Sequence, residues 1–177
     1  MGLYLIESSL KSLVATKEEL QQKTQELQGA LQKAGAALVE LQAAHDFSRA
    51  FFIVEADGQS AAANVLRENN IPVQLVKEVR LIGKDLEEVK KRNETVNYVV
   101  EWNIPEHLTM EDYLERKKKN SVHYEEVPEV TFSRTYVCED LTKCLCFYNA
   151  PDEAAVKRAR EAVKAPIDSI TEVLTEK

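Results

Sequence analysis

The chain has 177 residues, of which 44% are hydrophobic and 30% are charged. These fractions are typical of a folded globular protein and exclude a disordered chain. The formal net charge of −7 at pH 7 argues against binding to nucleic acid or to anionic membranes, because both partners attract a basic surface. No apolar run approaches the roughly 20 residues that span a bilayer. We therefore expect a soluble, cytoplasmic protein with reduced cysteines.

Strand and helix patterns alternate along the first half of the chain. A capping box formed by Thr16 and Glu19 predicts the start of a helix, and Gly35 is suited to its end. The expected elements, in chain order, are a strand at 3–7, a helix between Thr16 and Gly35, strands at 36–43 and 50–55, a helix at 60–69 and a strand at 73–82.

The second half predicts the same order of elements. Pro105 ends the first strand, and Thr109 with Asp112 caps the helix that follows. The expected elements are a strand at 96–103, a helix after Thr109, strands at 130–138 and 143–148, a helix at 152–164 and a strand at 169–174.

The two halves align without a gap at an offset of 94 residues, which indicates an internal repeat. Each half has the βαββαβ order of a ferredoxin-like unit. We therefore predict an α+β fold in which two tandem ferredoxin-like units form a pseudo-dimer, with a dimeric α/β-barrel as one form of that arrangement. The expected boundaries are 1–83 for a diverged repeat, 84–95 for a linker and 96–177 for the second repeat. The identities include Tyr4 with Tyr98, Glu7 with Glu101, Leu20 with Leu114, Asp46 with Asp140 and Pro72 with Pro166.

Three segments of the second half carry a family resemblance. The segments 98–101, 143–152 and 165–173 resemble the small nickel-binding ferredoxin-like family, which is catalogued as a domain of unknown function. The first half shows only an echo of these motifs. The resemblance implies the ferredoxin-like fold and a bound transition metal.

The resemblance also implies metal ligands on three strands, a Glu, a His and a Cys. Glu101 and Cys146 stand at the Glu and Cys positions, but Arg134 stands at the His position. An arginine stays protonated and offers no lone pair to a metal, so the implied set is incomplete. The counterparts in the first half are Glu7, Glu40 and Phe52.

The thiols of the second half form another candidate site. Cys138 and Cys144 flank a predicted hairpin loop, and Cys146 follows two residues later. Two or three thiolates in such a hairpin suit a soft or borderline ion such as zinc or nickel. His123, in the irregular segment before the hairpin, is a further candidate ligand. A cross-strand disulfide and simple burial of the thiols are the alternatives.

Strand alternation predicts which of these side chains share a face. With the most apolar sets assigned to the helix side, six residues are expected together on the open face. They are Glu101, Arg134, Tyr136, Cys144, Cys146 and Tyr148. The alternative is structural, an ion pair between Glu101 and Arg134 with the thiols packed as small core residues.

Three functional hypotheses follow. The favoured one is a non-catalytic protein that binds a small ligand or a transition metal, nickel or zinc. The alternative is a small-molecule enzyme of the dimeric α/β-barrel type, with a pocket between sheet and helices and Glu101, Tyr136 or His123 as acid or base. The third is an interaction module whose first half binds a protein partner. The sequence leaves homo-oligomerisation open.

Overall fold

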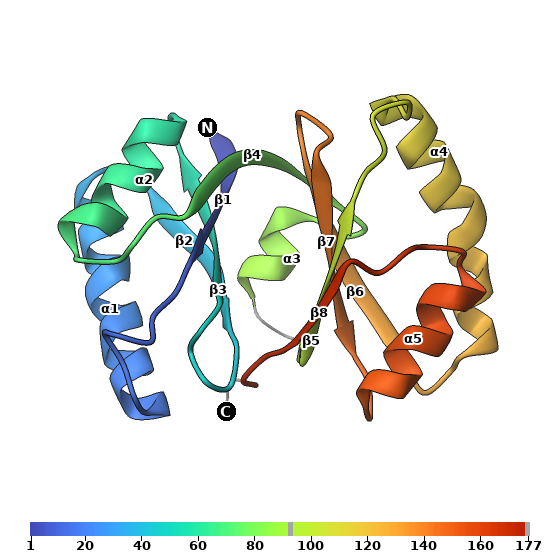
Figure 1. Ribbon diagram of the computed structural model, residues 1–177. Helices are drawn as coiled ribbons and strands as arrows, with labels where there is room; N and C mark the ends of the chain where they lie inside the picture. Colours follow the sequence, from blue (N-terminus) through green and yellow to red (C-terminus); the bar gives the residue numbers. More distant parts are fainter. Residues whose placement is uncertain (92–93, 176–177) are drawn as a thin grey trace. The chain divides into compact units, whose positions relative to one another are not determined.

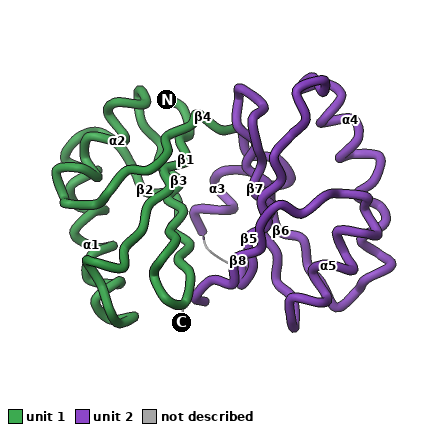
Figure 2. The backbone as a smooth tube through the Cα atoms, in the orientation of Figure 1, with its two compact units in different colours: residues 1–79 green, residues 80–177 purple. Residues whose placement is uncertain are grey.

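A computed structural model of the chain describes residues 1–91 and 94–175. The chain forms two compact units, Met1–Val79 and Arg80–Lys177 (Figure 2). Each unit is an α+β structure built from antiparallel strands and helices. None of the helices in the described residues is long and apolar enough to cross a membrane.

The first unit has the predicted βαββαβ order. Its helices both cover one face of its strands (Figure 1). The strand order is β2-β3-β1-β4, and each observed boundary lies within one or two residues of the predicted one. The elements are β1 (Gly2–Ser8), α1 (Lys17–Lys33), β2 (Ala37–Ala43), β3 (Ala50–Ala56), α2 (Gln59–Glu68) and β4 (Leu75–Ile82).

The second unit repeats this order after the short helix α3 (Leu86–Lys90). Its strands lie in the order β6-β7-β5-β8, and α4 and α5 cover one face (Figure 1). Helix α3 falls in the segment predicted as a linker, and residues 92–93 of that segment lie outside the described residues, as do 176–177. The other elements are β5 (Tyr98–Asn103), α4 (Met110–Asn120), a 3-10 helix η1 (Ser121–Glu126), β6 (Thr131–Cys138), β7 (Lys143–Asn149), α5 (Glu153–Ala162) and β8 (Ser169–Glu172).

The strand register is the same in both units when residue numbers are offset by 94. Ile6 pairs with Phe52 in the first unit, and Val100 pairs with Cys146 in the second. The irregularity in the second strand also recurs, between Leu38 and Glu40 and between Phe132 and Arg134. Position-by-position comparison of the units is therefore justified.

The predicted caps explain where the helices begin and end. The Thr16 hydroxyl accepts a hydrogen bond from the Glu19 amide at 3.1 Å, and Thr109 forms a reciprocal capping box with Asp112. Gly35 follows α1 with a φ of 78°, a conformation that glycine adopts without steric cost. These local signals alone set three helix ends.

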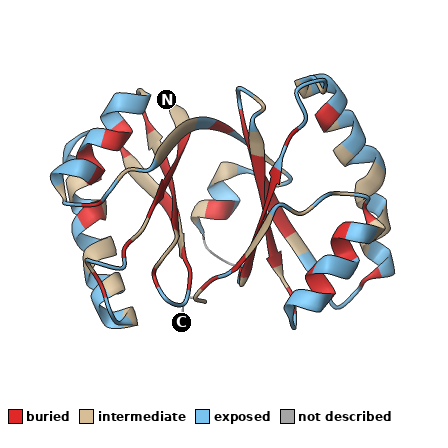
Figure 3. Cartoon of the chain, viewed as in Figure 1, coloured by how far each residue is buried: buried red, intermediate tan, exposed pale blue. Residues whose placement is uncertain are grey.

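The central strands of both units and the inner sides of their helices are largely buried and appear red in Figure 3, whereas β4 and β8 are mostly intermediate or exposed. In the second unit the helix side of the sheet carries a cluster of buried residues. This cluster contains aromatic and aliphatic residues from β5 and β7, with Ala155, Val156 and Ala159 from α5. The candidate site lies within this layer.

Candidate functional site

A cavity lies in the second unit, between the helix side of its sheet and helices α4 and α5. The volume available to the centres of water molecules is about 30 Å³, enough for roughly two or three waters. The cavity is partly open to solvent. The chemically important side chains that line it are Tyr113, Arg116, Lys117, Cys144, Cys146 and Arg160.

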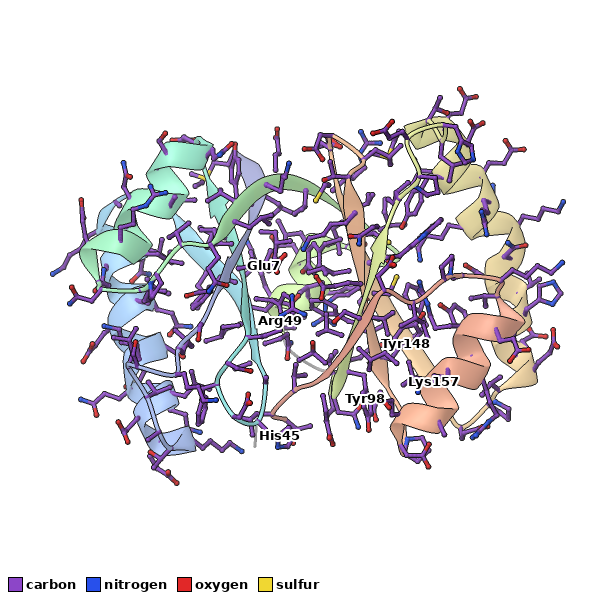
Figure 4. All side chains as sticks on the ribbon, in the orientation of Figure 1. Glu7, His45, Arg49, Tyr98, Tyr148 and Lys157 are labelled. Atoms are coloured by element: carbon purple, nitrogen blue, oxygen red, sulfur yellow. The ribbon has the colours of Figure 1, made fainter. Side chains whose placement is uncertain are left out.

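Strand β7 carries the thiols into this cavity. Cys144, Cys146 and Tyr148 alternate with Leu145 and Phe147, so the three point to the helix side. Figure 4 shows Tyr148 on the side of β7 that faces α5. On the neighbouring strand, the Thr135 hydroxyl donates a hydrogen bond to the sulfur of Cys146 at 3.3 Å.

The two thiols differ in acidity because their surroundings differ. A hydrogen bond from Cys144, together with the charges of Lys117 and Arg160 and the Thr135 hydroxyl, holds the pKa of Cys146 well below its usual range despite burial. That hydrogen bond, with burial and the negative charge on Cys146, raises the pKa of Cys144 well above its usual range. The hydrogen bond between the two thiols therefore favours the thiolate form at Cys146 over that at Cys144.

Arg160 is a buried cation on α5 and is only 2% exposed. Its Nη1 donates to the Tyr148 hydroxyl at 3.1 Å, and its Nη2 donates to the Pro166 carbonyl at 2.5 Å. Its Nε has no hydrogen-bond partner among the described residues. Burial acts to lower the pKa of Arg160, but negative charge at Cys146 and the Tyr148 hydroxyl raise it. The guanidinium therefore stays charged.

Three more cations border the cavity. Arg116 lies over the Trp102 ring at 5.3 Å and donates to the Lys164 carbonyl, while Lys117 lies over the Phe132 ring at 4.5 Å. Lys164 follows α5. Arg160 and these three side chains form no ion pair with any described residue. No carboxylate among the described residues lines the cavity. The cavity is therefore positively charged.

Tyrosines supply further polar groups at the cavity. The hydroxyls of Tyr124 and Tyr148 share a hydrogen bond of 2.5 Å. The Tyr113 hydroxyl is buried and has no hydrogen-bond partner among the described residues. Burial, reinforced by negative charge on Cys144 and Cys146, raises the pKa of Tyr113. Tyr113 therefore stays protonated, with its hydroxyl next to the Cys144 thiol at the cavity.

In the first unit, apolar residues occupy the positions that correspond to Arg160 and the two thiols. At the offset of 94, Leu66 corresponds to Arg160, Phe52 to Cys146 and Ala50 to Cys144. Leu66 is completely buried. The fold therefore does not require a cation or thiols at these positions.

The structure corrects the predicted sharing of faces. Glu101 pairs with Leu145, and Arg134 and Tyr136 pair with Phe147 and Leu145, so these three lie on the sheet face opposite the helices. Cys144, Cys146 and Tyr148 lie on the helix face, so the prediction of one shared face was wrong. The irregularity at Ser133 is part of the reason, because it reverses the alternation along β6.

The remaining candidate ligands are also apart. Cys138 follows Val137, which lies opposite Cys144, so Cys138 faces away from Cys144 rather than towards it. His123 lies in η1, where its Nδ1 is 2.6 Å from a carboxylate oxygen of Glu126.

Glu101 and the two first-half carboxylates have close polar partners instead. Glu101 accepts a hydrogen bond from the Lys143 ammonium at 3.0 Å. Glu7 forms an ion pair with Arg49 at 3.0 Å, and Figure 4 shows the two side chains together. Glu40 accepts from the Gln42 amide at 2.9 Å.

The nickel implied by the resemblance does not fit these residues. Glu101 and Cys146 occupy opposite faces, and Arg134 cannot serve as the third ligand. No group of three or more His, Cys, Asp or Glu side chains suited to a metal occurs in the described part of the chain. The reactive groups that line the cavity are thiols, phenols and cations.

The sequence interpretation missed Arg160, Arg116, Tyr113 and Lys164. For Arg160 a signal was present, because it lies one helical turn after Val156 and one before Val163, which places it in the apolar stripe of this helix. A charged residue in an apolar helix stripe indicates a buried polar group. Arg116, Tyr113 and Lys164 carry no comparable signal, because they lie in segments rich in charged residues that are typical of a solvent-exposed surface.

Comparison with known proteins adds a fold and a partial family match. A protein provisionally assigned as a chlorite dismutase (TA0507) matches 98% of this chain and 95% of its own, with 11% identity and a TM-score of 0.57. A protein provisionally assigned as a monooxygenase from Lactobacillus acidophilus matches 100% of this chain and 95% of its own, with 9% identity and a TM-score of 0.50. No curated protein sequence matches the chain.

These comparisons correct the favoured functional hypothesis. The two proteins just named carry enzyme descriptions, which favours the alternative hypothesis, an enzyme of the dimeric α/β-barrel type, over the hypothesis of a non-catalytic ligand- or metal-binding protein. At such low identity they establish the fold alone. The predicted resemblance is confirmed for less than half of the chain: residues 98–173 match the family of nickel-responsive proteins similar to SCO4226.

Proposed function

We propose that the protein is a small-molecule enzyme in which Cys146 acts as a nucleophile in the cavity of the second unit. The observation that carries this proposal is a thiol that borders a cavity together with a second thiol and a cluster of cations. Nucleophilic cysteines work as thiolates, and nearby cations stabilise that form. The fold shared with proteins described as enzymes agrees with a catalytic role.

The cavity residues support addition of the thiolate to a carbonyl carbon. The Cys146 sulfur forms a bond to that carbon, and the electron pair of the C=O double bond moves to the oxygen. The Tyr113 hydroxyl donates a hydrogen bond to this oxygen, and the cations stabilise its charge. Where this carbon also carries a leaving group, the electron pair on the oxygen re-forms the C=O bond and the leaving group departs with its bonding electrons and a proton from solvent, which gives a thioester. Water then attacks the thioester carbon, and the sulfur leaves with its electron pair, which restores the thiolate.

Alkylation by iodoacetamide tests the nucleophile. The thiolate displaces iodide from this small neutral reagent, and peptide mass spectrometry measures the rate at each cysteine. At pH 7 we expect Cys146 to react faster than Cys138, whose pKa is raised by burial, and a Cys146→Ser variant to lose the fast phase. The rate at Cys146 should stay high as the pH falls below the usual thiol pKa, because its own pKa is lowered.

The Cys138→Ser variant is the matched control, since Cys138 is equally buried but lies away from the cavity. It should keep the fast phase unchanged. Equal reaction rates at Cys146 and Cys138 in the folded protein would contradict the proposed nucleophile.

A further inference from the structure

We propose that the same cavity binds the carboxylate group of its substrate, with Arg160 as the buried anchor, so that the substrate is a small organic acid. This inference deepens the proposed function by naming the substrate class. It stands on the contacts of Arg160 and on the charge and size of the cavity.

Arg160 lines the cavity and has an unused hydrogen-bond donor, its buried Nε. Two of its nitrogens are held by Tyr148 and Pro166, at 3.1 and 2.5 Å, so the guanidinium is fixed in position. Its Nε is buried without a partner, and Arg160 lines the cavity. A buried donor without a partner is costly, and an anion in the cavity would satisfy it with a charge-assisted hydrogen bond.

The charges around the cavity favour one anion. Arg116, Lys117, Arg160 and Lys164 line it and form no ion pair within the described residues. A thiolate at Cys146 would offset only one of these four positive charges. The remaining excess attracts an anionic substrate, even though the protein as a whole has a net charge of −7.

The size of the cavity favours a carboxylate over a phosphate. Its room of about 30 Å³ for water centres accommodates roughly two or three water-sized groups. A planar carboxylate has three heavy atoms, whereas a phosphate group has five arranged as a tetrahedron. A guanidinium binds either group, so the size of the anion is the distinguishing property here.

The first unit shows that the fold does not require a cation at this position. Leu66 fills the corresponding position on α2 and is completely buried. A buried cation that the fold does not require supports a ligand-binding role for Arg160.

Paired alkylating reagents test this inference in the full-length protein. Iodoacetate and iodoacetamide have the same leaving group and nearly the same size, but only iodoacetate is an anion. We expect Cys146 to react with iodoacetate about tenfold faster than with iodoacetamide, which corresponds to about 1.4 kcal/mol of preference. Acetate should protect against both reagents, and an Arg160→Leu variant should lose the preference. An Arg158→Leu variant on the exposed side of α5 should keep it.

A second measurement separates this inference from the proposed function. In a Cys146→Ser variant, acetate should still shift the NMR signal of the Trp102 indole, since Trp102 lines the cavity and is the single tryptophan. If acetate binds but iodoacetamide does not label Cys146 in the wild type, the nucleophile fails and the carboxylate site stands. If labelling is fast but acetate neither binds nor protects, the carboxylate site is refuted. Protection by inorganic phosphate without protection by acetate also overturns it.

Discussion

Replacing Arg160 by leucine should stabilise the protein while it removes function. Arg160 is 2% exposed, lacks a carboxylate partner and leaves Nε unsatisfied. Replacing a buried charge by an apolar residue of similar volume is often neutral or stabilising by about 1–4 kcal/mol. Leu66 shows that leucine fits this position in the same fold.

The magnitude follows from opposing contributions. The variant no longer buries an unsatisfied donor, which is worth about 1–3 kcal/mol, but it loses the hydrogen bonds to Tyr148 and Pro166. Tyr148 keeps its partner Tyr124. We expect a net gain of about 1 kcal/mol in the free energy of unfolding, or about 3 °C in Tm for a chain of this size.

Urea unfolding followed by tryptophan fluorescence measures this change. The single tryptophan, Trp102, lies in the second unit beside the cavity, so its signal reports the unit that carries the substitution. Arg158→Leu is the control on the same helix, with an expected change within about 0.5 kcal/mol. Destabilisation by more than about 1 kcal/mol in Arg160→Leu would show that Arg160 is a structural residue and would refute this reasoning.

Three further predictions test the site and its scaffold. Tyr113→Phe removes an unsatisfied buried hydroxyl, so it should raise the free energy of unfolding by about 1 kcal/mol. The variant should also slow the reaction of Cys146 with a carbonyl substrate. A loss of stability would mean that the hydroxyl has a structural partner. Thr109→Ala removes the cap of α4 and should cost about 1 kcal/mol in urea unfolding, whereas Thr109→Ser should be neutral. Gly35→Ala, at a φ of 78°, should lower Tm through a loss of about 1 kcal/mol, and an unchanged Tm would contradict the positive φ.

The order of elements could be predicted from the sequence because its signals are local. The Thr16 and Thr109 hydroxyls cap helices within three residues of themselves, and Gly35 ends one through its own backbone. Hydrophobic alternation and the offset of 94 residues then predicted two βαββαβ units.

The faces of the strands could not be predicted in the same way. Strand β7 is apolar on both sides, with Leu145 and Phe147 on one face and Cys146 and Tyr148 on the other, so alternation alone does not say which face meets the helices. On β6 the irregularity at Ser133 reverses the pattern, and nothing in the local sequence announces it.

The cavity was decided by tertiary structure alone. Its groups come from β5, α4, η1, β7 and α5, and the distances between them depend on how the helices pack against the sheet. The sequence contained Arg160 at an inward position of α5, but not the thiols that face it across the layer. Local patterns determine elements and their ends, whereas the environment of a buried charge depends on residues far away in the chain, which only the packed fold brings together.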